Sequence, residues 1–457
     1  MEATQKKNKY EIDMCNGTIM DKLISFALPL MVSSILQLLF NAVDIIVVGR
    51  FTGCQALAAV GSTTALINMF VNLFIGVSLG ANVLSARFYA AGKEREMSET
   101  VHTAMTFALI SGIVMVFVGL FCTRGALGLM DTPADVIDQA ALYMKIYFCS
   151  MPFFMLYNYG AAVLRAVGDT KRPLLFLIIS GAINAVLNLF LVIAFSMGVA
   201  GVAIATVISQ VISCVLVLWC LFTTDSCYRL QISKLGIKGE YLLQIFQVGV
   251  PAGIQSVVIN FSNVLLQSSV NSFGSIAMEG YTAANNIFGF LFVSINSITQ
   301  ACMSFTSQNY GAGNIKRCKK VFWLNMLFGI VFTEILAVIF IVWSDFFVGI
   351  YTKSTAVAAY ALIRMYHVCS LEGLTTTYEV ESAALRGMGK SVEPAIFTIL
   401  GTVVFRLIWL GTVFRLLPTF DWLLNVYVAS WIFTGCALFI VYVRHMKKVE
   451  GRQKSAL

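Results

Sequence analysis

The chain of 457 residues is rich in apolar side chains: 58% of its residues are hydrophobic and only 12% are charged. Soluble chains carry about 25% charged residues, so the composition excludes a soluble globular protein. The net charge of +8 comes from short Lys and Arg clusters between apolar runs, without a basic face of interleaved aromatics, which argues against nucleic acid as a partner. The 11 cysteines form no C-x-x-C pair, and we expect neither metal binding nor redox chemistry from them.

Apolar runs follow one another along the whole chain and are long enough to cross a membrane. A stretch of about 20 apolar residues spans a bilayer, and the alternating segments of a membrane barrel are absent. Polar residues 1–22 precede the first run, 225–240 connect the sixth to the seventh, and 444–457 form a tail. The runs predict twelve membrane-spanning helices, at 23–48, 55–84, 97–121, 137–163, 173–196, 201–224, 241–270, 281–308, 321–344, 356–385, 394–415 and 422–443.

The Lys and Arg residues are distributed unevenly between the two sides of this predicted bundle. Of the 31, 24 lie on the side of the N-terminus, including Lys6, Lys7 and Lys9, four lie on the opposite side, and three lie within helices. Cytoplasmic loops of membrane proteins carry the excess of positive charge. We therefore expect a chain that crosses the plasma (inner) membrane many times, with both termini in the cytoplasm.

The sequence repeats itself at an offset of 221 residues. Tyr89–Gly92, after the second predicted helix, recurs as Tyr310–Gly313 after the eighth. Leu164–Asp169, after the fourth helix, recurs as Leu385–Lys390 after the tenth. Pro29 of the first helix and Pro251 of the seventh match at an offset of 222. Three matched landmarks in the same order indicate that the chain is a tandem duplication of a six-helix unit.

The duplication sets the expected fold class. Six is an even number, so both halves enter the membrane from the same side. We expect an all-α integral membrane protein whose twelve transmembrane helices form an N-lobe over 23–224 and a C-lobe over 241–443, related by a pseudo-two-fold axis along the membrane normal. Such parallel repeats are typical of secondary transporters, although a channel, a receptor or a membrane enzyme could use the same bundle.

In this order, the landmarks resemble those of the multidrug and toxic compound extrusion (MATE) family. They are an Asp late in the first helix, within Val43–Arg50, a Tyr-x-Ala-Gly after helices 2 and 8, and a Leu-Arg-x-x-Gly after helices 4 and 10. The resemblance covers essentially the whole chain. It implies an exporter of small organic, often cationic, compounds that is coupled to H⁺ or Na⁺, with two six-helix lobes forming a V around a central cavity. We expect no other cofactor, and a monomer in the lipid bilayer.

Asp44 is the first candidate for binding the coupling ion. A charged residue inside a membrane helix costs about 2.5–3.5 kcal/mol on insertion scales, so each one is a candidate functional group. Gln37, Asn41 and Asp44 are spaced i, i+4, i+7 and form one polar stripe on an otherwise apolar helix. The alternative is a carboxylate near the helix end that pairs with Arg50.

Polar groups on two further helices lie at a depth comparable with that of Asp44. Asn184 and Asn188 are one turn apart on the fifth helix, and Thr206 lies on the sixth. The MATE resemblance implies a cation site at these positions together with Asp44. Carboxylate, amide and hydroxyl oxygens suit a hard cation, whereas a carboxylate in a dry pocket could carry a proton. Alternatively, the two Asn side chains serve only as hydrogen-bonding contacts between helices.

The second lobe departs from the first, because the repeat aligns Asp44 with an apolar leucine. The seventh helix instead has a polar face, and the tenth has acids. Candidates for substrate binding or proton relay are Glu372, Glu379, Asn260, Asn263, Gln267 and, as an aromatic wall of the cavity, Tyr147. Alternatively, Glu372 forms a purely structural pair with Arg406, which lies at similar depth.

Catalysis has little support in the sequence. The three His residues have no metal-ligand spacing, and no phosphate loop or nucleophile elbow is present. We therefore expect a protein that is not an enzyme. The main rival to the exporter is a flippase for a lipid-linked sugar with the same general architecture, which should carry a basic cavity for pyrophosphate. Two unequal lobes give no selectivity ring, which argues against a channel.

Overall fold

A computed structural model describes residues 10–130 and 132–455, and contacts between residues divide the chain into two units. Unit 1 contains the described residues up to Asp13 together with Leu28–Gly249, and unit 2 contains Met14–Ala27 together with the described residues from Val250 onward. Part of the predicted N-terminal segment, with Lys6, Lys7 and Lys9, lies outside the described residues, as do the last two residues of the predicted tail.

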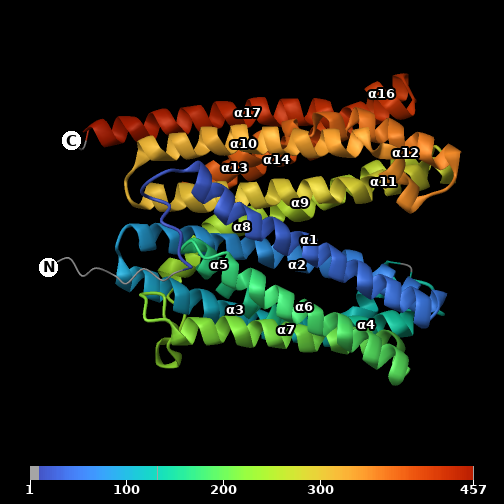
Figure 1. Ribbon diagram of the computed structural model, residues 1–457, viewed down its shortest axis with the longest axis horizontal. Helices are drawn as coiled ribbons and strands as arrows, with labels where there is room; N and C mark the ends of the chain where they lie inside the picture. Colours follow the sequence, from blue (N-terminus) through green and yellow to red (C-terminus); the bar gives the residue numbers. More distant parts are fainter. Residues whose placement is uncertain (1–9, 131, 456–457) are drawn as a thin grey trace. The chain divides into compact units, whose positions relative to one another are not determined.

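The helices form from long apolar runs, and short turns with glycine separate them (Figure 1). The first half of the sequence forms α1 (Met20–Phe51), α2 (Cys54–Ala90), α3 (Glu94–Leu129), α4 (Ile137–Cys149), α5 (Met151–Ala166), α6 (Lys171–Leu189), the π-helix η1 (Phe190–Ala194), α7 (Gly198–Thr223) and the 3₁₀-helix η2 (Ile232–Lys234).

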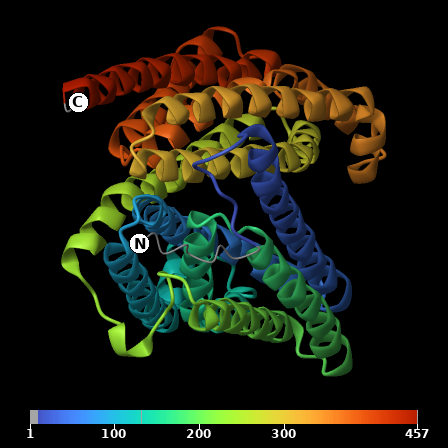
Figure 2. The same cartoon turned by 60° about the vertical axis from the view of Figure 1, so that its left-hand side comes forward.

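The second half begins with two long helices and is more broken toward its end. It forms α8 (Gly239–Asn271), α9 (Ser275–Gly311), α10 (Ile315–Val342), α11 (Ser344–Tyr351), α12 (Thr355–His367), the 3₁₀-helix η3 (Cys369–Leu371), α13 (Gly373–Gly387), α14 (Val392–Ile399), the π-helix η4 (Leu400–Val404), α15 (Phe405–Gly411), α16 (Val413–Leu416) and α17 (Phe420–Ser455). Successive long helices run in opposite directions, as α9 and α10 do in Figures 1 and 2.

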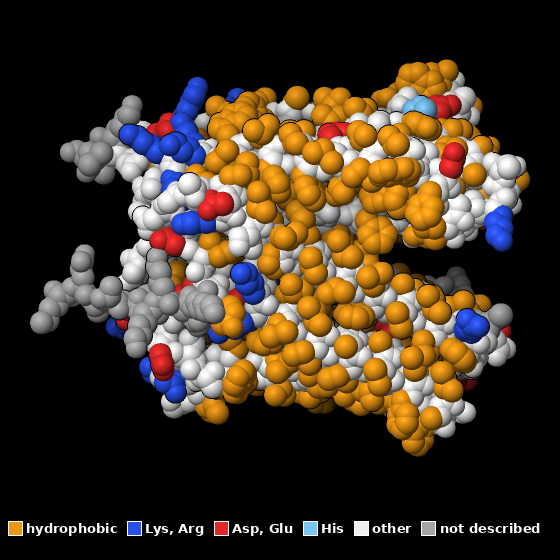
Figure 3. Space-filling model, viewed as in Figure 1, with side chains coloured by type: hydrophobic (Ala, Val, Ile, Leu, Met, Phe, Trp, Pro, Cys, Tyr) orange, Lys and Arg blue, Asp and Glu red, His pale blue; other side chains and the backbone are white. Residues whose placement is uncertain are grey.

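Ten stretches of the described chain are long and apolar enough to cross a membrane as single helices, and α4 with α5 makes an eleventh that bends by 46°. The bend follows Ser150, where Pro152 stands in the first turn of α5 and cannot continue the preceding hydrogen-bond ladder. The predicted helix 356–385 is divided into α12, η3 and α13. On the face shown in Figure 3, apolar side chains cover the middle of each unit and charged ones gather at the ends.

The duplication is visible in the backbone. Three glycine pairs that are 221 residues apart, Gly53 with Gly274, Gly92 with Gly313 and Gly168 with Gly389, all have positive φ angles. Glycine adopts this conformation without the steric penalty that a side chain brings. The packing repeats as well: α5 contacts α2, α3 and α7 in unit 1, and α13 contacts α9, α10 and α17 in unit 2.

Each unit takes the beginning of one helix from the other half of the sequence. The start of α1, through Ala27, belongs to unit 2, where the rings of Phe26 and Phe305 are 5.7 Å apart. The start of α8, through Gly249, belongs to unit 1. The change of unit falls next to a proline inside each helix, Pro29 in α1 and Pro251 in α8. The contact units therefore differ from the predicted lobes 23–224 and 241–443 at both helix starts.

The segment before α1 contacts both repeated motifs of unit 1, Tyr89–Gly92 and Leu164–Asp169. Glu11 accepts hydrogen bonds from the hydroxyls of Tyr89, at 2.9 Å, and Tyr228, at 2.7 Å. Burial raises the pKa of Tyr228 to about 12, so this hydroxyl stays protonated and remains a donor near neutral pH. A Cβ on Gly168 would come within 2.7 Å of the backbone nitrogen of Ile12, so only glycine permits this approach.

The next residues are held in unit 2. The side chain of Asn309 donates to the carbonyl of Met14 at 3.1 Å. The guanidinium of Arg317 donates to three carbonyls of this segment, those of Met14, Asn16 and Gly17, at 3.2, 3.0 and 2.8 Å. Residues 10–13 and 14–17 are thus fixed to different units.

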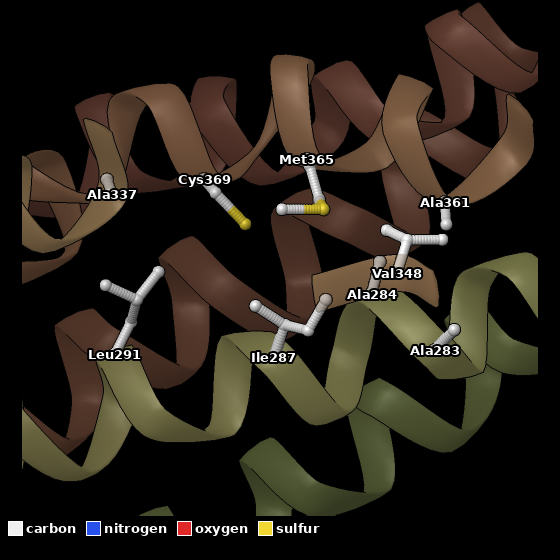
Figure 4. Packing of buried hydrophobic residues seen from close by; sticks show 9 residues of the cluster. All are labelled: Ala283, Ala284, Ile287, Leu291, Ala337, Val348, Ala361, Met365 and Cys369. Atoms are coloured by element: carbon white, nitrogen blue, oxygen red, sulfur yellow. The ribbon is translucent and has the colours of Figure 1, made fainter. Parts of the chain in front are cut away.

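A hydrophobic cluster joins α9, α10, α11, α12 and η3 in unit 2. In Figure 4 the side chains of Met365 and Cys369 point toward Ile287 and Leu291 of α9. Four of the nine residues are alanines, and such small side chains allow helices to pack tightly. The whole cluster comprises Ala283, Ala284, Ile287, Leu291, Ala337, Val348, Ala361, Met365 and Cys369.

Candidate functional site

A carboxylate and two amides meet inside unit 1. Asp44 is half-buried on α1, whereas Asn184 and Asn188 of α6 are 6% and 0% exposed. The Nδ2 of Asn188 donates both to Oδ1 of Asp44 and, at 3.1 Å, to Oδ1 of Asn184. Asn184 and Asn188 are four residues apart, so both present their amides on one face of α6. The structure thus brings together three of the four predicted ion ligands.

A glycine on α6 permits this contact between helices. A Cβ on Gly181 would overlap the ring of Phe40 on α1. Because Gly181 has no side chain, α1 lies close enough to α6 for Asp44 to reach Asn188 one to two turns further along. Immediately after these residues α6 passes into the π-helix η1, a rare helix type that is frequent at functional sites.

The donor set at Asp44 fits a hard cation or a proton. Asn188 Oδ1 is buried and has no hydrogen-bond partner within the described chain. An unpaired buried carbonyl oxygen costs about 1–3 kcal/mol, and a bound cation would remove that cost. Oxygen atoms from one carboxylate and neutral amides are the ligands that hard cations prefer. The same carboxylate could hold a proton instead.

Among the described residues, no hydrogen bond joins the other predicted members of this site to Asp44 or to the two amides. The hydroxyl of Thr206 donates to the carbonyl of Val202 in its own helix, at 3.0 Å. Gln37 and Asn41, the rest of the polar stripe, are exposed. Among the described residues Asp44 forms no ion pair with Arg50, so the structural alternative for this carboxylate is not formed.

Two tyrosines of α4 lie near the carboxylate. Tyr147 stacks on Tyr143 with ring centroids 6.2 Å apart, and both hydroxyls lie within electrostatic range of Asp44. The sequence analysis named Tyr147 as an aromatic wall of the cavity but did not name Tyr143. Their i, i+4 spacing was the signal that could have paired them.

In unit 2, the predicted acidic candidate is enclosed. Glu372, at the start of α13, is 0% exposed, and neither of its carboxylate oxygens has a hydrogen-bond partner in the described chain. No ion pair joins it to Arg406 within 4.0 Å among these residues, so the structural Glu–Arg pair is not formed in this conformation. Arg406 instead donates to Asn263 Oδ1 at 3.2 Å and to Ser430 Oγ at 3.3 Å.

A second buried arginine was counted in the sequence analysis as one of three basic residues within helices, but not as a candidate site residue. Arg364 of α12 is 1% exposed, its guanidinium carbon lies 3.9 Å from the ring centroid of Tyr281, and Nη2 donates to Asn285 Oδ1 at 2.9 Å. The hydroxyls of Tyr281 and Tyr427 are 2.6 Å apart. Both Arg364 and Arg406 also lie over the ring of Tyr427, which helps stabilise the two buried cations.

The remaining predicted residues of unit 2 do not join a single group. Gln267 donates to Asn271 at 3.1 Å, one turn along α8. Asn260 is exposed, and Glu379 is half-buried on α13. The polar residues predicted on α8 therefore do not form one enclosed site. Among those of them that the structure describes, only Asn263 contacts a buried cation, Arg406.

Comparison with known proteins agrees with this architecture. A sequence model of the MatE family matches residues 29–190 and 251–410, one match in each half of the chain. The probable multidrug resistance protein YoeA of Bacillus subtilis is 29% identical over 412 residues, covering 87% of this chain and 86% of its own. The probable multidrug resistance protein YpnP of the same organism is 29% identical over 307 residues, covering 67% and 68%.

A solved structure shares the fold. It shows the outward-facing conformation of a multidrug resistance MATE family transporter and superimposes with a TM-score of 0.91 at 20% sequence identity, covering 98% of this chain and all of that one. The twelve-helix, two-lobe fold predicted from the repeat is thereby confirmed. With the family match in both halves, the chain belongs to the MatE family of multidrug and toxic compound extrusion transporters.

Proposed function

We propose that this protein is an antiporter that exports organic, mainly cationic, compounds across the plasma membrane by alternating access, in exchange for H⁺ or Na⁺. The observation that carries the proposal is the group of Asp44, Asn188 and Asn184 on helices that are largely apolar. The names of the relatives, which are multidrug resistance proteins, support an exported drug-like substrate.

The coupling works through differential affinity for the ion in two conformations. A ligand shifts an equilibrium only by the difference between its affinities for the two states. An ion that enters from outside and binds at Asp44 would favour the state that releases the compound outward, and its release inward would restore the state that recruits the compound. The unpaired Oδ1 of Asn188 gives the ion-bound state one additional ligand.

A lipid-linked sugar flippase is the second candidate, and the buried cations Arg364 and Arg406 are the observation that favours it. A pyrophosphate needs such cations. However, Tyr281 and Tyr427 enclose them, and the two side chains are only 1% and 5% exposed. The carboxylate of Asp44 is half-buried and not fully enclosed, which favours the exporter of cations.

Transport by the purified protein in proteoliposomes tests the proposal. We expect efflux of a fluorescent organic cation when a Na⁺ gradient or a proton gradient is imposed, and none without a gradient. The gradient that drives efflux identifies the coupling ion. Efflux that neither gradient stimulates would refute the antiporter, and movement of a labelled lipid-linked sugar in the same vesicles would establish the rival.

The expected topology has its own test. We predict that a single cysteine introduced at Lys234, in the connection 225–240, reacts with a thiol reagent only after the cells are opened, because 24 of the 31 basic residues lie on that side. The matched control is a cysteine at Lys353, which we expect on the outside. Labelling of position 234 in intact cells by an impermeant reagent would invert the orientation.

A further inference from the structure

A basic cavity opens in unit 2 near the end of α17. It has a volume of about 550 Å³, and its lining comes from α17, from α14 and the turn before it, and from Tyr310. Arg444, Lys448 and Arg452 are four residues apart, so they share one face of α17, and Lys390 adds a fourth cation from the turn. Figure 3 shows Lys and Arg side chains gathered at this end of the unit.

The charge in this cavity is unbalanced. Among the described residues that line it, Glu393 is the one carboxylate, against four Lys and Arg side chains. None of the four cationic groups forms an ion pair with a carboxylate within 4.0 Å in the described part of the chain. In addition, Nε2 of His445 is buried in the lining and has no hydrogen-bond partner there. The cavity thus offers several donors to an anion.

A second cavity, in unit 1, shows that this imbalance is not a general property of the charged ends. It has nearly the same volume, about 560 Å³, but its lining contains equal numbers of acidic and basic residues. The acids are Glu94, Glu99 and Asp225, and the bases are Arg95, Arg229 and Lys234. Two of these cations are already paired, Arg95 with Glu99 at 3.2 Å and Arg229 with Asp225 at 3.8 Å. An excess of basic residues on one side of the membrane therefore does not by itself produce unpaired cations around a cavity.

The basic cavity also has an apolar wall, made by Phe397, Val441 and Val449. Next to it on α14, Val392 and Ile396 are 53% and 49% exposed and belong to the apolar surface of a candidate membrane span. A free inorganic anion gains nothing from an apolar wall. A lipid would place its headgroup among the cations and its acyl chains against this surface.

We propose that this cavity binds the phosphate headgroup of an anionic phospholipid in the adjacent leaflet. Basic pockets between membrane helices recognise anionic headgroups in this way. The bidentate guanidinium groups of Arg444 and Arg452 match the oxygens of a phosphate. The bound lipid would link α17 to the turn between α13 and α14. Because Tyr310 and Lys390 both line the cavity, it would also contact both landmarks of the second repeat, Tyr310–Gly313 and Leu385–Lys390.

Native mass spectrometry of the full-length protein in detergent with phosphatidylglycerol or phosphatidylcholine tests this proposal. We expect the wild type to retain phosphatidylglycerol preferentially. R444Q/K448Q should bind it about 30-fold more weakly, because each Lys or Arg near an anionic surface contributes about 1 kcal/mol and about 1.4 kcal/mol corresponds to tenfold. R444K/K448R keeps both charges and should retain most of the binding.

The cavity of unit 1 provides the matched control. R229Q/K234Q removes the same net charge from the lining of the unit 1 cavity, on the side of the membrane that the distribution of Lys and Arg predicts for both cavities, and should leave phosphatidylglycerol binding unchanged. The melting temperature of each variant in phosphatidylcholine checks that it is folded. If the double variant unfolds, K448Q alone replaces it, with an expected loss of affinity of about fivefold. Equal binding by wild type and R444Q/K448Q, equal loss in the control, or displacement of the lipid by millimolar inorganic phosphate alone would overturn the proposal.

Discussion

Asp44→Asn should give a protein that inserts and folds but no longer drives efflux. An amide at position 44 keeps the size of the side chain and can still accept the hydrogen bond from Asn188, so the packing of α1 on α6 survives. It loses the charge that would bind the coupling ion. Contacts to a charged group are worth about 1.5–3 kcal/mol, so ion affinity should fall at least about tenfold and gradient-driven efflux should be lost.

Drug susceptibility of cells that express the variant measures this effect, together with efflux in proteoliposomes. Asp138→Asn is the matched control: Asp138 forms an ion pair with Arg124 in which both side chains are highly exposed, and such pairs contribute little. We expect wild-type resistance from Asp138→Asn and the sensitivity of cells without the transporter from Asp44→Asn. Wild-type resistance from Asp44→Asn would remove this carboxylate from the coupling.

Gly80→Ala should strongly destabilise the folded protein, although it adds only one methyl group. The added Cβ would overlap the carbonyl of Ile245 and lie 3.0 Å from the backbone nitrogen of Gly249. Both neighbours are backbone atoms of α8, so the clash cannot be relieved by turning a side chain. Overpacking of this kind costs about 1–3 kcal/mol, and the start of α8 should detach from α2.

Thermal unfolding of the purified variants in detergent checks this expectation. Gly61→Ala is the control, because Gly61 lies in the same helix and a Cβ there meets no atom of the described residues within 4 Å. Alanine is favoured over glycine in a helix by about 1 kcal/mol, so Gly61→Ala should hold or raise the melting temperature while Gly80→Ala lowers it. Equal melting temperatures for the two variants would show that α2 and α8 do not touch in this way.

The sequence predicts the number of helices and the repeat better than it predicts where helices break. The duplicated motifs locate the turns at Gly92 and Gly168, whose positive φ angles glycine adopts without a steric penalty. The sequence analysis missed the bend between α4 and α5 because mean hydropathy averages over Pro152. It missed the division of 356–385 because the mean hydropathy of this segment does not reveal a local change of helix type.

The same limit applies to the candidate site. Depth along a helix can be counted from a sequence, and it groups Asp44 with Asn188 and with Thr206. The direction in which each side chain points around its helix is set by packing, and there Asn188 reaches Asp44 while Thr206 bonds to its own backbone. Arg444, Lys448 and Arg452 were predicted only as charges on one side, since the opposing wall of their cavity is about 50 residues away in the sequence.

Because each unit takes the start of one helix from the other half of the chain, neither half of the sequence contains a complete unit. The first half lacks the beginning of α8 that completes unit 1, and the second lacks the beginning of α1 that completes unit 2. A six-helix ancestor with this packing would have found its missing segment in another copy of itself, as domain-swapped dimers do. Fusion of two such copies would turn a concentration-dependent association into an intramolecular one. It would also free each copy to diverge, as the leucine that the repeat aligns with Asp44 illustrates.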